Sequence, residues 1–444
     1  MKVVVIGCTH AGTFAIKQVL AEHPEAEVIV YEKNDNISFL SCGIALYLGD
    51  QIKDPQGLFY SNPEELRKLG ANVKMLHEVT DVDLGKKQVT VKNLDEEISL
   101  TDSYDKLIIT TGSWPIVPPI KGIDNDKVYL CKNWNHAQEL FKVAPDAKRI
   151  TVIGAGYIGA DLAEAYSRTG HEVTLIDGAP RVMPKYFNDE MTNIVEKDFT
   201  DHGVKLALDE AVQEIKGEDV ITVTTDKGTY ETDLVILCVG FRPNTALFKD
   251  KLDMLPNGAL ITNEYMQTSD PDVFGAGDSV AVHYNPTHSN AYIPLATNAV
   301  RQGILVGKNL VKPTVKYMGT QATSGLMLYE RTACATGLTI EAAKAQGVNA
   351  REVRLTDNYR PEFMPTTEKV LMEIVSEKGT NKILGAQFLS KYDITQSANT
   401  LSVAIQNEMT LEDLALQDFF FQPHFDRPWN YLNILAQAAL AEAE

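Results

Sequence analysis

Residues 149–177 read RITVIGAGYIGADLAEAYSRTGHEVTLID. An apolar strand runs into a glycine turn, a helix follows, and a second apolar strand ends at Asp177. Gly154, Gly156 and Gly159 give the complete GxGxxG spacing between strand and helix. Glycines at this spacing allow a tight turn and the close approach of a pyrophosphate, which lies on the helix N-terminus. The stretch therefore predicts a βαβ unit that binds a dinucleotide.

The acid at the end of the second strand bears on which dinucleotide binds. Asp177 lies 18 residues past Gly159, where a carboxylate accepts hydrogen bonds from a ribose diol and repels a 2′-phosphate. This favours NADH over NADPH. Arg181 follows closely and weakens the preference, because a guanidinium attracts phosphate.

The same pattern occurs near the start of the sequence. Residues 2–32 run KVVVIGCTHAG, then a helical stretch, then EVIVYE. Gly7 and Gly12 take the first and last glycine positions, and Thr9 takes the middle one. Glu32 ends the second strand as a ribose-binding acid should. Two such units imply two dinucleotides, and one that stays bound beside a nicotinamide is most simply FAD.

Each unit is followed, after a long interval, by an apolar strand that closes on glycine, at 107–112 and at 235–240. We therefore predict that the second domain is inserted into the first. The first domain should resume near Pro243 and carry Asp278, in GAGDS, toward the ribityl or phosphate end of the flavin. A helix is expected at 294–310, where its N-terminus would stabilise the negative charge of a reduced flavin.

The rest of the chain changes character. It alternates like antiparallel strands and then ends in helices, with an aromatic-rich break, FFFQPHFDRPWN, at 419–430. The predicted fold class is α/β, with two Rossmann-like dinucleotide-binding domains and an α+β C-terminal domain. The predicted ranges are 1–112 and 243–312 for the FAD-binding domain, 113–242 for the NAD-binding domain, and 313–444 for the C-terminal domain.

Composition narrows the classes of partner. The formal net charge of −19 over 444 residues argues against nucleic acid or an anionic membrane as a partner. No apolar run is long enough to span a bilayer, and the opening MKVVVIGC enters a strand directly, so no signal peptide is expected. Five cysteines form neither a disulfide framework nor a CxxC pair, which fits a reducing cytoplasm and no metal site.

One cysteine stands out. Residues 38–50 read SFLSCGIALYLGD, and Cys42 has no thiol partner five residues away on either side. A buried structural cysteine is the default interpretation. A helix start beside a flavin would instead give Cys42 thiolate character and make it reactive. The other four cysteines fit the structural interpretation, since they lie in apolar strands or in the first glycine turn.

These motifs together resemble the single-cysteine class of pyridine nucleotide–disulfide oxidoreductases, which holds NADH peroxidases, NADH oxidases and coenzyme A-disulfide reductases. In detail the chain is most similar to the water-forming NADH oxidases of lactic acid bacteria. The resemblance covers essentially the whole sequence and rests on GCTHAG, YEKND, SFLSCG, TTGSWP, GAGYIG, VGFRPN, GAGDS, LATNAVRQG and FFFQPHFDRPWN. It implies a C-terminal dimerisation domain, and so a homodimer or higher homo-oligomer in which the aromatic break approaches the flavin of the partner subunit.

The resemblance also implies roles for residues. Cys42 is the redox cysteine beside the flavin, and His10 faces the same spot, either as a catalytic proton donor or only as a helix-cap residue. Tyr157 would lie over the flavin until NADH displaces it, and Asp161 stands where the family usually has Glu. With the motif residues, the expected FAD contacts are Gly7, Thr9, His10, Ala11, Gly12, Glu32, Cys42, Val79, Thr111, Gly112, Ser113, Lys132, Asp278, Leu295, Ala296 and Thr297. The expected NADH contacts are Gly154, Gly156, Tyr157, Ile158, Gly159, Asp177, Tyr186 and Gly240.

The expected activity is the four-electron reduction of O2 to water by NADH, with Cys42 cycling between thiolate and sulfenic acid. NADH peroxidase and coenzyme A-disulfide reductase remain alternatives, because the motifs alone do not separate them. A flavin-bearing redox sensor is a remote alternative from another class. Steady NADH turnover in air would argue against a sensor.

Overall fold

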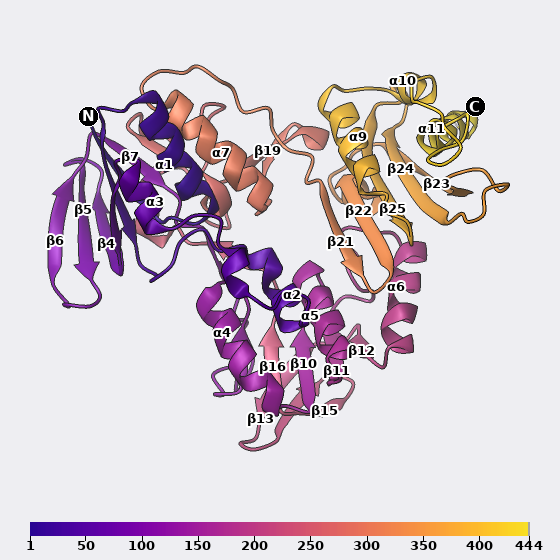
Figure 1. Ribbon diagram of the computed structural model, residues 1–444, viewed down its shortest axis with the longest axis horizontal. Helices are drawn as coiled ribbons and strands as arrows, with labels where there is room; N and C mark the ends of the chain where they lie inside the picture. Colours follow the sequence, from indigo (N-terminus) through magenta and orange to yellow (C-terminus); the bar gives the residue numbers. More distant parts are fainter. Residues whose placement is uncertain (443–444) are drawn as a thin grey trace.

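The fold is described from a computed structural model, which covers residues 1–442. Over that range, three five-stranded sheets organise the chain. Figure 1 shows the first at the upper left, the second at the bottom centre and the third at the right. The two glycine turns belong to the first and second sheets, so the first two units carry the predicted dinucleotide sites.

The first sheet is parallel, in the spatial order β18-β7-β1-β2-β3. Its strands are β1 (Lys2–Ile6), β2 (Glu27–Glu32), β3 (Asn72–Met75), β7 (Lys106–Ile109) and β18 (Val273–Gly275). Helices α1 (His10–Glu22) and α7 (Ala296–Asn309) pack together against one face, where a valine-rich core forms. The antiparallel sheet of β4 (His77–Asp83), β5 (Gln88–Asn93) and β6 (Ser99–Ser103) covers the other face.

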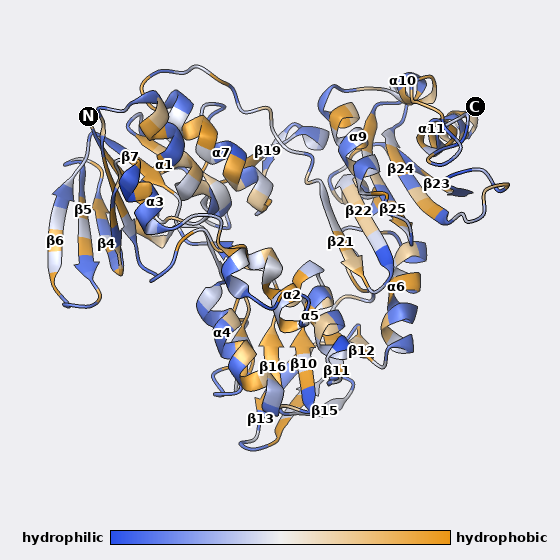
Figure 2. Ribbon diagram, in the orientation of Figure 1, coloured by the Kyte–Doolittle hydropathy of each residue, from blue (hydrophilic) through white to orange (hydrophobic). Residues whose placement is uncertain are grey.

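The second unit repeats this plan. Its parallel sheet has the order β12-β11-β10-β16-β9. The strands are β9 (Val128–Leu130), β10 (Arg149–Ile153), β11 (Glu172–Asp177), β12 (Lys205–Leu208) and β16 (Leu234–Leu237). One face packs on α4 (Trp134–Val143), α5 (Tyr157–Arg168) and α6 (Asp189–Asp201). The other packs on β13 (Val212–Lys216), β14 (Ile221–Thr225) and β15 (Thr229–Thr232). Figure 2 shows β10 and β16 as strongly apolar, as strands covered on both faces should be.

A short ribbon joins the two units. Strand β8 (Ser113–Pro115) pairs antiparallel with β17 (Phe241–Pro243), so the chain leaves the first unit and returns to it at the same place. Two adjacent crossings of this kind are consistent with one domain inserted into another. The residue ranges given above for the three domains stay a prediction.

The third sheet is antiparallel, in the order β21-β22-β25-β24-β23. Its strands are β21 (Ser324–Leu328), β22 (Arg331–Gly337), β23 (Ala350–Asn358), β24 (Lys369–Glu377) and β25 (Ile383–Ser390). Helices α9 (Thr395–Gln406), α10 (Leu411–Ala415) and α11 (Tyr431–Ala441) bury leucines and alanines against it. The aromatic-rich stretch 419–430 forms neither helix nor strand and lies between α10 and α11.

Shorter elements complete the described chain. They are α2 (Ile44–Leu48), α3 (Pro63–Lys68), α8 (Ile340–Ala345), the hairpin of β19 (Val282–Tyr284) and β20 (Ser289–Ala291), and 3-10 turns at Ser41–Gly43, Pro55–Leu58, Ala144–Asp146, Ala246–Phe248, Gly277–Ser279 and Asn285–Thr287.

The predicted fold class is confirmed, including the parallel sheets, the helix at 296–309 and the antiparallel C-terminal sheet. The two small antiparallel sheets that cover the parallel ones were not predicted. Both contain a register shift, between Val79 and Asp81 in β4 and between Val212 and Glu214 in β13. A bulge breaks the alternation of apolar and polar residues that marks a strand in sequence.

Candidate active site

The first glycine of each turn is required by the chain's own backbone. Gly7 and Gly154 have φ of +91° and +107°. A Cβ on Gly7 would lie 2.5 Å from the Thr110 carbonyl oxygen, and one on Gly154 would lie 2.4 Å from that of Cys238. Side chains at these positions would meet both strain and a clash. Each strand therefore turns sharply and presents the following helix N-terminus to the space above the sheet.

The acids that end β2 and β11 reach back to these turns. Glu32 is 3% exposed and accepts hydrogen bonds from the backbone N–H groups of Cys8, at 2.7 Å, and Asn34, at 2.8 Å. Burial raises the pKa of Glu32, and these two donors oppose the shift. Asp177 accepts from the N–H of Ala155 at 2.5 Å and is half-buried. Both carboxylates thus lie beside a glycine turn, as ribose-binding acids must.

A polar cluster joins three of the predicted FAD contacts from separate elements. Asp278, in the 3-10 turn after β18, accepts from the Ser113 hydroxyl at 2.7 Å and pairs with the Lys132 ammonium at 3.0 Å. His10 lies near the same groups. Burial lowers the pKa of the His10 imidazole, Asp278 opposes that shift and Lys132 adds to it. His10 Nδ1 is 2.9 Å from the Tyr60 hydroxyl, and the two rings stack.

Two buried hydroxyls around this cluster have no protein partner in the described part of the chain. They belong to Thr111 and Tyr292. Burial and Asp278 raise the pKa of Tyr292, and the nearby Ser113 hydroxyl opposes the shift, so the phenol lies at the cluster. Buried hydroxyls are almost always hydrogen-bonded in folded proteins. These unpaired groups, the Asp278 cluster and the turn at Gly7 fit a bound flavin dinucleotide.

Cys42 differs from the other four cysteines. It is the exposed one among the cysteines of the described chain, and it lies in the 3-10 turn that leads directly into α2. Burial raises the pKa of Cys8, Cys131 and Cys334 to about 12, and that of Cys238 well above its usual value. The default interpretation, a buried structural thiol, therefore describes those four and not Cys42.

The segment that carries Cys42 is tied to the first glycine turn. The Ser38 N–H donates to the Cys8 carbonyl at 3.2 Å. The Ser38 hydroxyl donates to the Ser61 carbonyl at 2.6 Å, next to the Tyr60 that contacts His10. Within residues 1–442, no hydrogen bond joins the side chains of Cys42 and His10 directly.

On the NADH side, Tyr157 is the first residue of α5. Its ring centroid is 4.1 Å from that of Tyr186, and its hydroxyl is 2.8 Å from that of Ser324 on β21. One turn further along α5, burial raises the pKa of Asp161 to about 7, and Glu164 adds to the shift. Arg181 donates to the Phe187 carbonyl, just before α6, and to the Thr192 hydroxyl on α6. Its guanidinium is therefore held by the start of α6 and the residues before it.

Other predicted contacts occupy varied positions. Ala11 is buried in α1. Leu295 is the N-cap residue of α7, which begins with Ala296 and Thr297. Gly112 and Gly240 have positive φ beside the β8–β17 ribbon. Ile158 packs at the edge of the second unit's core. Val79 stands apart, because its side chain is buried between the first sheet and β4–β6.

Sequence reasoning missed Tyr60, Tyr292 and Ser324. None lies in a motif with a fixed spacing, and each reaches the site from an element distant in sequence.

Within residues 1–442, no helix combines the length and the apolar character needed to cross a membrane. No group of three potential metal ligands occurs in the same range.

Two dinucleotide turns on one chain and a single exposed cysteine at a helix start define the class of two-dinucleotide oxidoreductases. Comparison with known proteins agrees. Residues 1–303 match the family described as pyridine nucleotide-disulphide oxidoreductase, and residues 326–431 match its dimerisation domain. The chain belongs to this family, as its sequence predicted, and is an oxidoreductase enzyme.

Particular relatives are close. An NADH oxidase of Enterococcus faecalis is 61% identical over 443 residues, covering 99% of each chain. The solved structure of a water-forming NADH oxidase from Lactobacillus brevis, bound to NADH, is 68% identical with a TM-score of 0.99, covering 100% of this chain and 99% of that one. An engineered mutant of that enzyme, described as a water-forming NADPH oxidase bound to NADPH, is 67% identical with a TM-score of 0.99 and the same coverage.

Proposed function

We propose that this protein is a water-forming NADH oxidase. It uses FAD in the first unit and NADH in the second, and reduces one O2 to two waters with two NADH and two protons. The observation that carries the proposal is the exposed Cys42, without a partner thiol, on a segment tied to the first glycine turn. The identity to NADH oxidases over the whole chain supports it.

The chain's own residues hold the two dinucleotides. Glu32 and Asp177 receive the ribose hydroxyls, and the N-termini of α1 and α5 receive the pyrophosphates. Bound FAD supplies the redox chemistry, accepting hydride from NADH and passing electrons to O2. Ser113, Lys132 and Asp278, which contact one another, would also hold the flavin.

Cys42 accounts for the second half of the reaction. Its thiolate attacks hydrogen peroxide, one water leaves, and the sulfur becomes a sulfenic acid. A second pair of electrons from NADH returns the sulfenic acid to thiolate with release of the second water. A neighbouring thiol would trap the sulfenic acid as a disulfide, and the other four cysteines are buried or half-buried with raised pKa values.

His10 is the group that holds a proton at this site. Its Nδ1 faces the Tyr60 hydroxyl, and burial with Lys132 nearby favours the neutral imidazole. A neutral imidazole accepts the thiol proton and returns it to a leaving hydroxide.

The test is the ratio of NADH to O2 consumed, with a parallel peroxide assay. Two NADH per O2 and no free peroxide support the proposal. NADH loss that occurs only when peroxide is added would make the protein an NADH peroxidase. Loss only with coenzyme A disulfide would make it a coenzyme A-disulfide reductase, and a single reduction without further turnover would make it a redox sensor.

We also propose that two chains pair through the aromatic stretch between α10 and α11, where each completes the flavin site of the other. Leu416, Phe420, Phe421, Phe425 and Trp429 are exposed there, from 47% to 76%. Exposed apolar patches of this kind mark interfaces. The match to the family's dimerisation domain includes all five.

The pairing is tested by the double change Phe420→Glu and Phe425→Glu, which should give monomers with reduced FAD content. Val220→Glu changes an exposed apolar residue elsewhere and should leave the assembly intact. Light scattering after size-exclusion chromatography reads the result, and a double variant that stays dimeric contradicts this interface.

The five free cysteines fit a cytoplasmic location, which we propose on that ground.

A further inference from the structure

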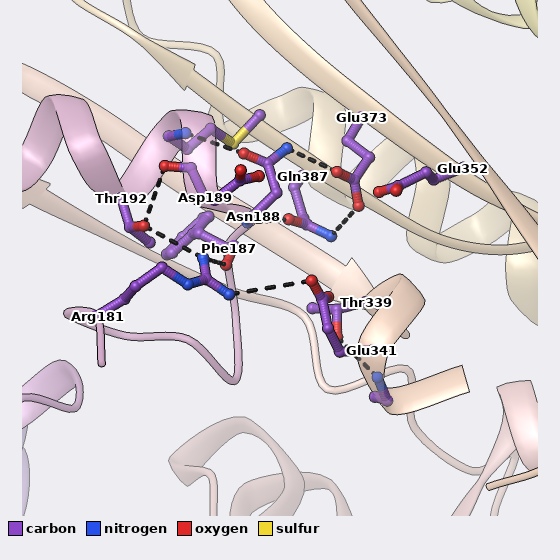
Figure 3. Close-up of polar contacts among 12 residues, drawn as sticks. Arg181, Phe187, Asn188, Asp189, Thr192, Thr339, Glu341, Glu352, Glu373 and Gln387 are labelled. Carbon is purple, nitrogen blue, oxygen red and sulfur yellow. Dashed lines mark hydrogen bonds and ion pairs between the residues drawn. The ribbon is translucent and has the colours of Figure 1, made fainter. Parts of the chain in front are cut away.

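A fully buried glutamate lies where the C-terminal sheet meets the second unit. Glu373, in the middle of β24, has 0% exposure. Its carboxylate accepts hydrogen bonds from Asn188 Nδ2 at 2.6 Å, Gln387 Nε2 at 2.8 Å and Arg354 Nε at 3.1 Å. Figure 3 shows Asn188 and Gln387 converging on it. A buried carboxylate is tolerated only when donors satisfy it in this way.

Asn188 makes this cluster a junction between the two units. It is the N-cap residue of α6, and its Oδ1 accepts from the Met191 N–H at 2.9 Å. Its own N–H donates to Gln387 Oε1 at 2.8 Å. Arg354 adds a second link, because it also pairs with Asp189 at 2.6 Å. The start of α6 is therefore held by β23, β24 and β25.

The segment that precedes Asn188 carries Tyr186. This loop, 178–188, connects β11 to α6 and touches the second glycine turn, since the Met183 N–H donates to the Ala155 carbonyl at 2.8 Å. The Tyr186 N–H donates to the Met183 carbonyl at 3.0 Å. Tyr186 thus lies between a contact to the glycine turn on one side and Asn188 on the other.

Arg181 braces the same loop. It donates to the Phe187 carbonyl and to Thr192 at 3.2 Å each, and its guanidinium is 3.9 Å from Glu341 on α8 (Figure 3). The loop is tied at both ends to the C-terminal unit and holds the ring of Tyr186 against that of Tyr157, 4.1 Å away.

We propose that Glu373 is a positioning residue for NADH: through Asn188 it fixes the loop 178–188, and so places Tyr186 beside Tyr157 at the mouth of the nicotinamide site. This rests on the proposed function, because it assumes that NADH binds along the second glycine turn. The C-terminal unit then contributes to dinucleotide affinity within a single chain. Burial raises the pKa of Glu373 and the nearby Glu352 adds to the shift, whereas Asn188 and Arg354 oppose it, so these two residues favour the ionised carboxylate.

The test compares Glu373→Gln with Glu377→Gln. The second change is the same substitution on the same strand, at a residue whose carboxylate accepts from Thr380 and does not touch the loop. Glu373→Gln replaces one of the two accepting oxygens with an NH2 group, so either Asn188 or Gln387 loses its acceptor and the loop should loosen. We expect the dissociation constant for NAD+ and the KM for NADH to rise about fivefold, with kcat at saturating NADH, FAD content and product unchanged. Glu377→Gln should match the wild type.

Asn188→Ser gives a second, independent variant. Serine keeps the helix cap but lacks the amide that donates to Glu373, so affinity should fall about threefold without loss of α6. If Glu373→Gln does not fold, this variant decides. NAD+ affinity within a factor of about two of the wild type in the folded variants would overturn the proposal, as would a fall in kcat and FAD content equal to the loss of affinity. NAD+ binding is measured without turnover, so it decides this point even if the wild type proves not to be an oxidase.

Discussion

The turn between β1 and α1 and the turn between β10 and α5 have the same backbone constraint at their outer glycines and differ at the middle position. In both, a Cβ on the last glycine would strike the carbonyl of the first, at 2.2 Å for Gly12 and 1.8 Å for Gly159. The middle position differs: the first turn has Thr9 there, and the second has Gly156, whose added Cβ would meet nothing within 4 Å. The fold therefore requires the outer glycines, and only a ligand can require the middle one.

The first helix residues and the acids differ as well. His10 begins α1 and Tyr157 begins α5, so the same position carries a titrating group in one unit and an aromatic ring in the other. Glu32 is buried and Asp177 is half-buried. A carboxylate buried from solvent suits a dinucleotide that stays bound, and a more exposed carboxylate suits a dinucleotide that exchanges. We infer that small local changes adapt one motif to a resident cofactor in the first unit and to a substrate in the second.

The largest expected effect comes from the first glycines. Gly154→Ala would force a side chain into φ +107° and a 2.4 Å contact with the Cys238 carbonyl oxygen. We expect a loss of about 3 kcal/mol or more in the free energy of unfolding. Gly7→Ala should cost a similar amount and also release FAD. Chemical unfolding and the visible absorbance of the flavin measure both, and unchanged unfolding midpoints would show that the turns are not as the structure has them.

A smaller effect concerns Asp161, which takes the position of Phe14 in the first unit. Burial raises the pKa of Asp161 to about 7 from 3.8. The folded chain therefore keeps a proton that the unfolded chain loses, and stability falls as pH rises from about 4 to about 7. Asp161→Asn should remove this loss, so its stability relative to the wild type should be higher at pH 8 than at pH 4. Urea unfolding measures the free energy of unfolding of the wild type and of Asp161→Asn at the two pH values. The same dependence of stability on pH in both proteins would count against a buried acid at this position.

The two acids should differ in what their loss does. Asp177→Ala removes the repulsion of a 2′-phosphate and should narrow the preference for NADH over NADPH by about tenfold. Glu32→Gln should leave that preference unchanged, because Glu32 serves the other site. The measurement is kcat/KM with each nucleotide. A wild type that uses both nucleotides equally would remove the ribose role of Asp177.

The smallest effect belongs to the middle glycine. Gly156→Ala has room for its Cβ in the chain itself, so the melting temperature should stay within about 2 °C of the wild type. The KM for NADH should rise about fivefold, because the methyl group would meet the pyrophosphate. If the variant is destabilised and binds NADH normally, the assignment of this position to the ligand is wrong.

Local patterns were sufficient to predict much of this molecule. The glycine spacing located the strand–turn–helix units, because positive φ and close backbone approach leave few alternatives to glycine. Contacts between distant segments could not be predicted in this way. Tyr60 reaches His10 across 50 residues, and Ser324 reaches Tyr157 across 167. The Glu373 cluster joins α6 to three strands of another sheet, and no spacing in the sequence marks such a junction.

The proposed role of Cys42 is to take the second pair of electrons, and the ratio of NADH to O2 consumed tests this role. NADH and O2 consumption are recorded together, with a peroxide assay, for the wild type and for Cys42→Ser. We expect two NADH per O2 without peroxide for the wild type. For the variant we expect one NADH per O2 with an equal amount of peroxide, since a bound flavin would reduce O2 to peroxide without the thiol. An unchanged ratio in Cys42→Ser, or peroxide released by the wild type, would contradict it.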